Sequence, residues 1–274
     1  MDERPRPDIR AVVRPAAGAL VAGVVVAVAG CGAAASPDPA ATSPGPAATV
    51  TGEVFVSAAA SLADAFAEIE VAFEHRHPDV DVVRNLAGSA TLREQVLEGA
   101  PTDVVALANA QTMAALEDAG LTDGPAVTFA TNTVTIAVPA ANPGGVTGLA
   151  DFARDDLLIG LCIEGVPCGD LARQVLDAAG VVARIDTNEP DVRALLARIA
   201  ADEVDAGITY VTDVASADGA VVGIEIPSAD AIVADLPIAT LADAPNPAGA
   251  EAFKAFVLGE DGQAIMARHG FGAP

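Results

Sequence analysis

The fold is decided by residues 53–83, which read EVFVSAAASLADAFAEIEVAFEHRHPDVDVV. The segment opens with a short aliphatic run, Val54–Val56, that is typical of a buried strand. Apolar residues then recur at helical spacing, at Leu62, Phe66, Ile69 and Phe73. Pro78 marks the end of this helix, and Val80–Val83 is a second aliphatic run. The segment therefore predicts a strand, a helix and a second strand, which is the unit of a parallel α/β sheet.

The same alternation continues along the chain. Further strands are expected at 103–108, 134–138, 157–163 and 206–209, with helical patterns between them. This pattern predicts an α/β protein with mainly parallel sheets and helices on both faces, in which ligands bind outside the carboxyl ends of the strands. Ser61, followed three residues later by Asp64, has the spacing of a capping box at the start of a helix.

Composition limits the kind of protein. The 274 residues are 52% hydrophobic but only 3% aromatic, so the core must be built from Ala, Val, Leu and Ile. The formal net charge is −24, and Lys254 is the only lysine. This balance argues against nucleic acid and anionic lipid as partners, since both are held largely by Lys and Arg. It also has a simple structural meaning, a soluble and self-repelling surface.

The N-terminus predicts the compartment. Four arginines precede the apolar run 16–29, which has the length of a signal-peptide core and ends in small residues before Cys31. This arrangement resembles a lipoprotein signal, with residues 1–30 removed and Cys31 lipidated; an uncleaved anchor helix is the alternative. Residues 31–52 are rich in Pro and Ala and are expected to be a flexible tether. Either reading places the rest of the chain outside the cytoplasm, attached to the membrane only through its N-terminus.

Several segments, taken in order, resemble the periplasmic molybdate-binding proteins of ABC importers. They are VSAAASL (56–62), AGSATL (87–92), GAPTDV (99–104), VPCG (166–169), DVRAL (191–195), AGITYVTD (206–213) and HGFG (269–272). Each segment is weak evidence alone, but their joint order covers residues 53–272. The resemblance implies a solute-binding protein that captures molybdate, and tungstate as well, delivers it to an ABC permease, acts as a monomer and needs no cofactor.

The resemblance also implies a two-lobed periplasmic-binding-protein fold of type II, with the ligand in the cleft between the lobes. The first lobe is expected to comprise residues 53–131 and 236–274, and the second residues 132–235. From the sequence pattern, the chain is expected to cross between the lobes at Asn132 and at 231–237.

Five positions match the oxyanion contacts of that family. Ser61 and Ser89 are expected to supply hydroxyl and backbone N–H groups, Cys168 and Val192 their backbone N–H groups, and Tyr210 its phenol. Two departures are notable, because the family commonly has Ala at the position of Cys168 and often Tyr at that of Asp170. No residue is expected to coordinate a metal through its side chain.

Elementary chemistry supports this assignment. A tetrahedral dianion needs hydrogen-bond donors, and helix N-termini supply unpaired N–H groups at the positive end of a dipole. Ser61, Ser89 and Val192 all lie at predicted helix starts. None of the five positions offers a side-chain acceptor for a protonated anion such as hydrogen phosphate, and a cavity fitted to molybdate is too large for sulfate. We therefore expect selectivity for molybdate and tungstate.

Each of these residues also has a purely structural interpretation. Ser61 and Ser89 are ordinary helix caps, and Val192 and Tyr210 ordinary core residues, unless the resemblance holds. With Cys31 assigned to the lipid, Cys162 and Cys168 are expected to form a disulfide in an oxidising compartment; a reactive thiol is the alternative. The three histidines are scattered and do not have the spacing of a metal site.

Other functions were weighed against solute binding. A secreted serine or cysteine hydrolase lacks a Gly-x-Ser-x-Gly motif and a recognisable histidine partner. A protein of the same fold that binds another oxyanion or small solute stays open, as does a cell-surface interaction module without a ligand. The sequence thus favours a binding protein over an enzyme.

Overall fold

The computed structural model describes residues 50–227 and 232–274 of the chain. The predicted signal peptide, Cys31, the tether up to residue 49 and residue 231 of one predicted crossing lie outside the described residues. The described residues belong to one compact unit. In the described ranges, no helix combines the length and the apolar character that a membrane span requires.

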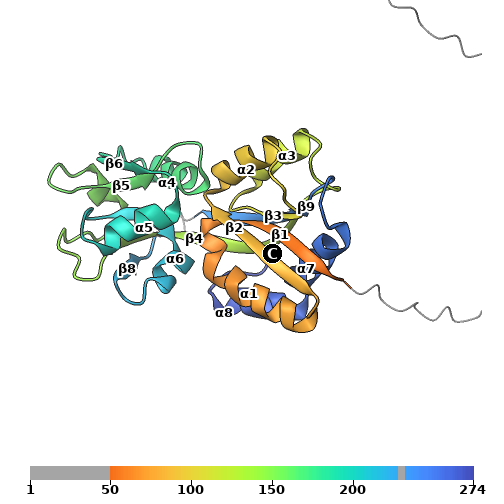
Figure 1. The fold of residues 1–274 in the computed structure, drawn as a ribbon. Coiled ribbons are helices and arrows are strands. Elements are labelled where there is room, and N and C mark those ends of the chain that lie inside the picture. The colour runs from red at the N-terminus through yellow and green to blue at the C-terminus, as the bar shows by residue number, and fades with distance from the viewer. Residues whose placement is uncertain (1–49, 228–231) are drawn as a thin grey trace, which may run out of the picture. The chain divides into compact units, whose positions relative to one another are not determined.

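The helices and strands alternate through most of the chain (Figure 1). The strands are β1 (Gly52–Ala59), β2 (Val80–Ala87), β3 (Val104–Ala106), β4 (Val127–Pro139), β5 (Gly160–Cys162), β6 (Thr187–Glu189), β7 (Gly207–Tyr210), β8 (Val221–Ile224) and β9 (Val233–Thr240). The α-helices are α1 (Ala63–Arg76), α2 (Ser89–Leu97), α3 (Ala110–Asp118), α4 (Pro167–Ala178), α5 (Val192–Ala200), α6 (Val211–Ser216), α7 (Pro247–Leu258) and α8 (Glu260–Arg268). Two 3₁₀ helices are η1 (Ala60–Leu62) and η2 (Leu149–Ala153).

The β-α-β unit predicted from residues 53–83 is present. Strands β1 and β2 pair in parallel from Gly52↔Val80 to Ala59↔Ala87, and β3 pairs in parallel with the other edge of β1. Helices α1, α7 and α8 cover one face of this sheet and α2 and α3 the other (Figure 1). Successive residues of β3 alternate between two core clusters, because side chains of a strand point to opposite faces: Val104 and Ala106 join the larger cluster and Val105 the smaller.

The sheet is mixed, so the prediction of mainly parallel sheets was wrong in this detail. Its strand order is β2-β1-β3-β9-β4-β7, with β8 also paired to β4. Strand β9 is antiparallel to β3 and β4, and β7 and β8 are antiparallel to β4. Strands β4 and β9 form an antiparallel pair. The local alternation of strands and helices in the sequence does not indicate the direction in which distant strands pair.

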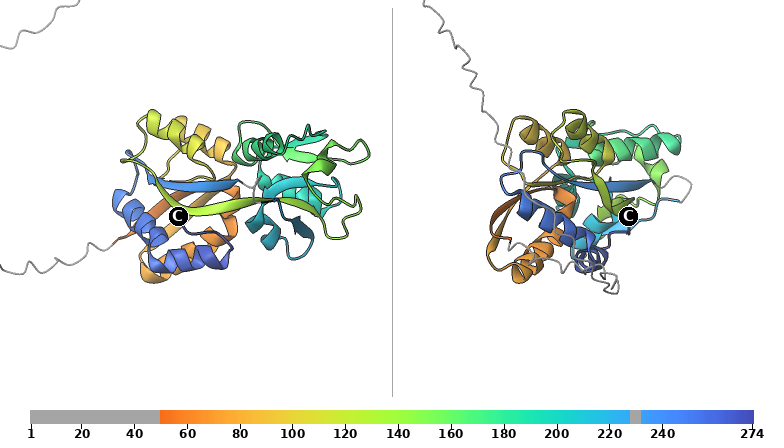
Figure 2. Two further views of the ribbon diagram at one scale, coloured as in Figure 1. Left: turned by 180° about the vertical axis from the view of Figure 1, so that it is seen from behind. Right: turned by 90° about the vertical axis from the view of Figure 1, so that its right-hand side faces the viewer.

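Strand β4 joins two groups of elements. The first group comprises β1–β3, β9, α1–α3, α7 and α8. Residues 127–133 of β4 pair with β9 of this group. Its residues 134–139 pair with β7 and β8, within the second group (β5–β8 and α4–α6). Figure 2 shows β4 as one long strand that runs from the first group to the second. The two predicted crossings lie side by side, because Asn132 of β4 pairs with Ala234 of β9.

The predicted capping box at Ser61 is absent. Ser61 lies within η1, and α1 begins at Ala63 with Leu62 as its N-cap and without a side-chain cap. The Asp64 carboxylate instead pairs with Arg193 of α5. The side chains of Ser61 and Asp64 are therefore both available for contacts outside their own helix.

Candidate functional site

A small cavity lies between the first and second groups of elements. From the first group it is lined by Ala59, Ala60, Ser61, Gly88, Ser89 and Ala108. From the second group it is lined by Val166, Pro167, Cys168, Asp191, Val192 and Tyr210. All five residues predicted to contact the ligand therefore lie around one cavity, although 149 positions separate Ser61 from Tyr210 along the chain.

The cavity suits only a compact ligand. The volume open to the centre of a water-sized sphere is about 20 Å³. A single water molecule needs roughly 10–15 Å³ on the same measure. In this conformation the site has room for one or two water molecules, so it suits only a compact ion, and an organic solute with an aromatic ring does not fit.

Three α-helices begin at the cavity. The first residues of α2, α4 and α5 are Ser89, Pro167 and Val192, all of which line it. The first N–H groups of a helix have no acceptor within the helix and lie at the positive end of its dipole. The three helix starts thus direct backbone donors and partial positive charge at one small volume, which is an arrangement suited to an anion.

The close approach of α2 and α5 depends on a glycine. A Cβ atom built on Gly88, the N-cap of α2, would lie 3.2 Å from Cβ of Asp191, the N-cap of α5. This separation is tighter than most Cβ contacts, so alanine at this position would require the start of α5 to shift by a few tenths of an ångström. In the sequence, Gly88 is notable only as part of the AGSATL segment (87–92), and its contact with Asp191 was not predicted.

Three hydroxyl groups add donors to the cavity. The buried Oγ of Ser61 and Oη of Tyr210 have no hydrogen-bond partner among the described residues. Ser89 Oγ accepts a hydrogen bond from the backbone N–H of Ala108 at 3.1 Å, which leaves its own hydrogen free to donate. A buried polar group without a partner is costly, so unpaired hydroxyls in a cavity point to a ligand that accepts their hydrogen bonds.

Tyr210 is held in its neutral, donating form. Burial strongly raises the pKa of its phenol, and the nearby carboxylates of Asp213 and Asp170 raise it further. The phenol therefore keeps its proton at any physiological pH. Asp213 itself is buried at the start of α6, where Oδ2 accepts the backbone N–H of Tyr210 at 3.1 Å.

Burial also raises the pKa of Asp213, to about 7, since the hydrogen bond from Tyr210 and the charge of Arg193 offset only part of the cost. Sequence reasoning assigned Asp213 no role, although it ends one of the segments that carried the resemblance. The signal that could have found it is a carboxylate placed three residues after Tyr210, within the first turn of a helix.

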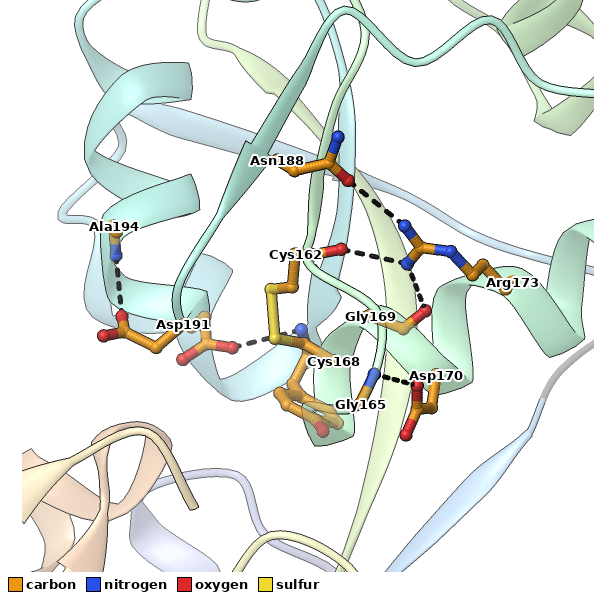
Figure 3. The surroundings of a disulfide bond; sticks show 11 residues. Cys162, Gly165, Cys168, Gly169, Asp170, Arg173, Asn188, Asp191 and Ala194 are labelled. Carbon is orange, nitrogen blue, oxygen red and sulfur yellow. Dashed lines mark hydrogen bonds between the residues drawn. A yellow bond between two sulfur atoms is a disulfide. The ribbon is translucent and has the colours of Figure 1, made fainter. Parts of the chain in front are cut away.

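The cavity has no cationic side chain among its described lining residues. Its one carboxylate, Asp191, caps α5, where Oδ1 accepts the N–H of Ala194 at 2.9 Å (Figure 3). The groups offered to a ligand are therefore neutral donors and helix dipoles. No cluster of His, Cys, Asp or Glu with the arrangement of a metal site occurs in the part of the chain that the structure describes.

Cys168 lines the cavity, and its sulfur is bonded to that of Cys162. The two cysteines form a disulfide across a Cα–Cα distance of 5.8 Å (Figure 3). Arg173 reinforces this turn by donating to the carbonyl oxygens of Cys162 and Gly169 at 2.9 and 2.8 Å. The sulfur of Cys168 is thus not a free thiol. A cysteine has the same backbone N–H as the alanine that the resembled family commonly has here, so this donor is retained.

Asp170 is occupied within the same turn. Its Oδ1 accepts the N–H of Gly165 at 2.7 Å and so closes the loop ahead of α4 (Figure 3). The carboxylate that departs from the resembled family therefore stabilises the loop that carries Cys168.

Comparison with known proteins agrees with the geometry. The family model described as "Bacterial extracellular solute-binding protein" matches residues 54–272. The molybdate-binding protein ModA of Mycobacterium tuberculosis is 36% identical over 221 residues, which cover 81% of this chain and 85% of that protein.

Two solved structures share the fold. The periplasmic molybdate-binding protein of Azotobacter vinelandii has a TM-score of 0.69 at 20% identity, covering 81% of this chain and 99% of that one. The sulfate-binding protein SubI of Mycobacterium tuberculosis has a TM-score of 0.68 at 18% identity, covering 80% of this chain and 86% of that one. These likenesses confirm the α/β periplasmic-binding-protein fold. Because the family model matches most of the chain and a relative exceeds one third identity, this protein belongs to the bacterial extracellular solute-binding protein family.

Proposed function

We propose that this protein captures molybdate, and tungstate with it, through neutral donors and delivers it to an ABC permease. The observation that carries the proposal is the convergence of three helix starts and the unpaired hydroxyls of Ser61 and Tyr210 on one small cavity. A relative whose name states molybdate binding is 36% identical to this chain. The proposed contacts are the hydroxyl and N–H groups of Ser61 and Ser89, the N–H groups of Cys168 and Val192, and the phenol of Tyr210.

Selectivity against phosphate and sulfate follows from different features. Hydrogen phosphate carries a proton that needs an acceptor, and the only carboxylate lining the cavity is Asp191, whose Oδ1 is engaged by the N–H of Ala194 as the cap of α5, so that only its Oδ2 would be left to accept this proton. Sulfate is smaller than molybdate, so donors set for the larger ion lie too far from its oxygens. The fold alone does not decide between these ions, since the sulfate-binding protein SubI shares it.

The two groups of elements are proposed to be lobes that close on the ion. Lobe 1 would comprise residues 53–131 and 236–274 and lobe 2 residues 132–235, with β4 and β9 as the connecting strands. Ligand donors come from both groups, so closure completes the site and excludes water from it.

The proposed place of the protein is outside the cytoplasmic membrane. Residues 1–30 would be a signal peptide and Cys31 the lipidated N-terminus, with residues 31–52 as the tether and the folded unit a monomer. Solute-binding proteins are not enzymes, and the unpaired hydroxyls of this site have no neighbouring histidine among the lining residues to activate a nucleophile.

Isothermal titration calorimetry of the full chain with molybdate, tungstate, sulfate and phosphate tests the ligand. The chain has no tryptophan and a single tyrosine, so the fluorescence of Tyr210 reports on the site directly. Tight molybdate and tungstate binding that changes this fluorescence, with sulfate and phosphate silent, is expected. Equal sulfate binding would contradict the selectivity, and no heat with any of the four ions would contradict the function.

The anchor is tested separately by expressing Cys31→Ala in a bacterium with a lipoprotein pathway. We expect the wild-type chain to fractionate with membranes and the variant to lose this attachment. Membrane association unchanged by the substitution would contradict lipidation at Cys31.

A further inference from the structure

Arg193 bridges the two groups of elements beside the proposed anion site. It is the second residue of α5 and follows Val192, which lines the cavity. Its guanidinium reaches the first group, where Nε donates to the carbonyl oxygen of Ala60 at 3.3 Å and Nη2 pairs with the carboxylate of Asp64. Nη1 donates to Ser216 Oγ at 3.3 Å within the second group.

Arg193 lies outside the cavity. It lines a second, larger hollow together with Asp64 and Ser216, and Ser61 is the residue that lines both spaces. The backbone at residues 60 and 61 therefore separates the anion cavity from the arginine. A contact between Arg193 and the bound ion is not part of this geometry.

The decisive contact is with a peptide group shared by Ala60 and Ser61. The carbonyl of Ala60 and the N–H of Ser61 belong to one peptide unit, which is trans, as are all the described peptide bonds. In a trans peptide these two groups point in opposite directions. The Ala60 oxygen also accepts the N–H of Ala63 within η1, so this short helix already orients the peptide, with the Ser61 N–H on the side away from the arginine. The hydrogen bond from Arg193 adds to that orientation and polarises the Ser61 N–H as a stronger donor.

We infer that Arg193 is a positioning residue for anion binding: from the opposite lobe it braces the Ala60–Ser61 peptide, which η1 already orients, and it strengthens the Ser61 N–H as a donor to the ion when the lobes are closed. The inference rests on the proposed function. The pair with Asp64 is secondary, because the side chains are 32% and 52% exposed and exposed ion pairs contribute little. Closure of the lobes thereby strengthens the hydrogen bond from the Ser61 N–H to the ion.

Arg198 provides a matched control. It lies on the same helix and has a similarly exposed side chain, and its ion-pair partners among the described residues are Glu189 and Glu203, both near α5 in the second group. Arg193→Gln and Arg198→Gln therefore remove the same charge from one helix, and only the first removes a contact between groups.

The test compares Arg193→Gln, Arg193→Lys, Asp64→Asn and Arg198→Gln in the full chain by calorimetry and stopped-flow kinetics with molybdate. We expect Arg193→Gln to weaken binding by about tenfold or more, the loss of a hydrogen bond to a charged group, mostly through faster dissociation. Arg193→Lys keeps a charge for Asp64 but lacks the planar fork, so it restores only part of the affinity. Asp64→Asn is expected to cost less than about threefold, and Arg198→Gln to change nothing.

Wild-type affinity in Arg193→Gln would overturn the inference while leaving the proposed function intact. Full rescue by Arg193→Lys would also overturn it, since charge alone would then suffice. A second measurement covers the case in which the wild-type chain binds none of the anions. Hydrogen exchange of residues 57–64 without ligand should be faster in Arg193→Gln than in Arg198→Gln. Equal exchange rates in that case would overturn the inference along with the function.

Discussion

The hydroxyls of Ser61 and Tyr210 are buried, line the same cavity and have no partner among the described residues. Leaving a buried polar group unpaired costs roughly 1–3 kcal/mol. The free protein bears this cost at two positions, and an anion that accepts both hydrogen bonds removes it. Ligand affinity and stability of the unliganded chain should therefore respond to these hydroxyls with opposite signs.

Tyr210→Phe is expected to weaken molybdate binding by about 10- to 100-fold, because a hydrogen bond to a charged group contributes roughly 1.5–3 kcal/mol. The same change should leave the unliganded protein equally stable or more stable in urea unfolding. Thr209→Val is the matched control, since Thr209 Oγ1 is also buried and unpaired but lies outside the cavity lining. It should raise stability without changing affinity. Parallel losses of binding in both variants would contradict a specific contact from Tyr210.

Asp213 makes the protein sensitive to pH. Burial raises the pKa of its carboxyl from 3.8 to about 7, so the folded protein holds a proton that the unfolded chain has released between those values. Stability therefore falls as pH rises from about 4 to about 7, by up to ~4 kcal/mol if the whole shift is realised. Above pH 7 the ionised carboxylate also repels a bound anion.

Asp213→Asn is expected to abolish this dependence. Unfolding free energy measured from pH 5 to pH 8 should fall in the wild-type chain and stay nearly level in the variant, and molybdate affinity should follow the same pattern. Asp118→Asn, an exposed carboxylate at the end of α3, controls for the loss of one charge. A wild-type stability profile that is flat over this range would contradict a proton held by Asp213.

At the scale of elements, a disulfide and a tightly packed glycine fix the start of α4. The disulfide closes a loop of six residues from the end of β5 to Cys168, and Gly169 packs against the same strand end. A Cβ on Gly169 would lie 1.9 Å from the carbonyl oxygen of Ile163, so only glycine fits there. These constraints fix the direction in which α4 presents its first N–H groups.

Replacing both Cys162 and Cys168 by alanine is expected to lower the free energy of unfolding by about 2 kcal/mol, since the crosslinked loop is short. Molybdate affinity should fall as well, because the Cys168 N–H is less firmly placed. Urea unfolding and calorimetry of the variant provide the measurements, and the wild-type chain with reductant should behave like the variant. An unchanged unfolding midpoint would show that the turn is already fixed by Asp170 and Arg173.

Around β5, the sequence predicted that a strand is present but not how long it is. A strand was expected over 157–163, but β5 comprises only Gly160–Cys162. Asp205 and Asp186 accept the N–H groups of Leu158 and Ile159 with their side chains, so backbone pairing there is limited to an isolated bridge between Ile159 and Ala206 and hydrogen bonds to the two carbonyl groups. Such long-range contacts leave no local periodicity in the sequence.

At the scale of the whole molecule, net charge should govern the rate of capture. A chain of net charge −24 repels a dianion at long range, while the site itself uses neutral donors at short range. We expect the association rate constant of molybdate to rise with ionic strength, because salt screens repulsion over about 10 Å at 0.1 M. The dissociation rate, set by buried contacts, should change much less.

Stopped-flow measurements of Tyr210 fluorescence from about 10 to 500 mM salt test this behaviour, with the Debye length falling several-fold over that range. Sodium chloride and potassium chloride should give the same slope, which controls for specific ion effects. An association rate that falls with salt would show instead that a local positive field guides the ion to the cavity.

The sequence by itself determined the α/β class, the β-α-β unit of residues 53–83 and the five residues around the cavity. These follow from local periodicity and from short segments that resemble a known family. Only the tertiary structure decided the mixed sheet, the use of Asp64 by Arg193 instead of as a cap, and the roles of Gly88 and Asp213. The physical reason is that hydrophobic period and turn residues act over a few positions. Strand direction, ion pairing and burial instead depend on partners that folding brings from distant parts of the chain.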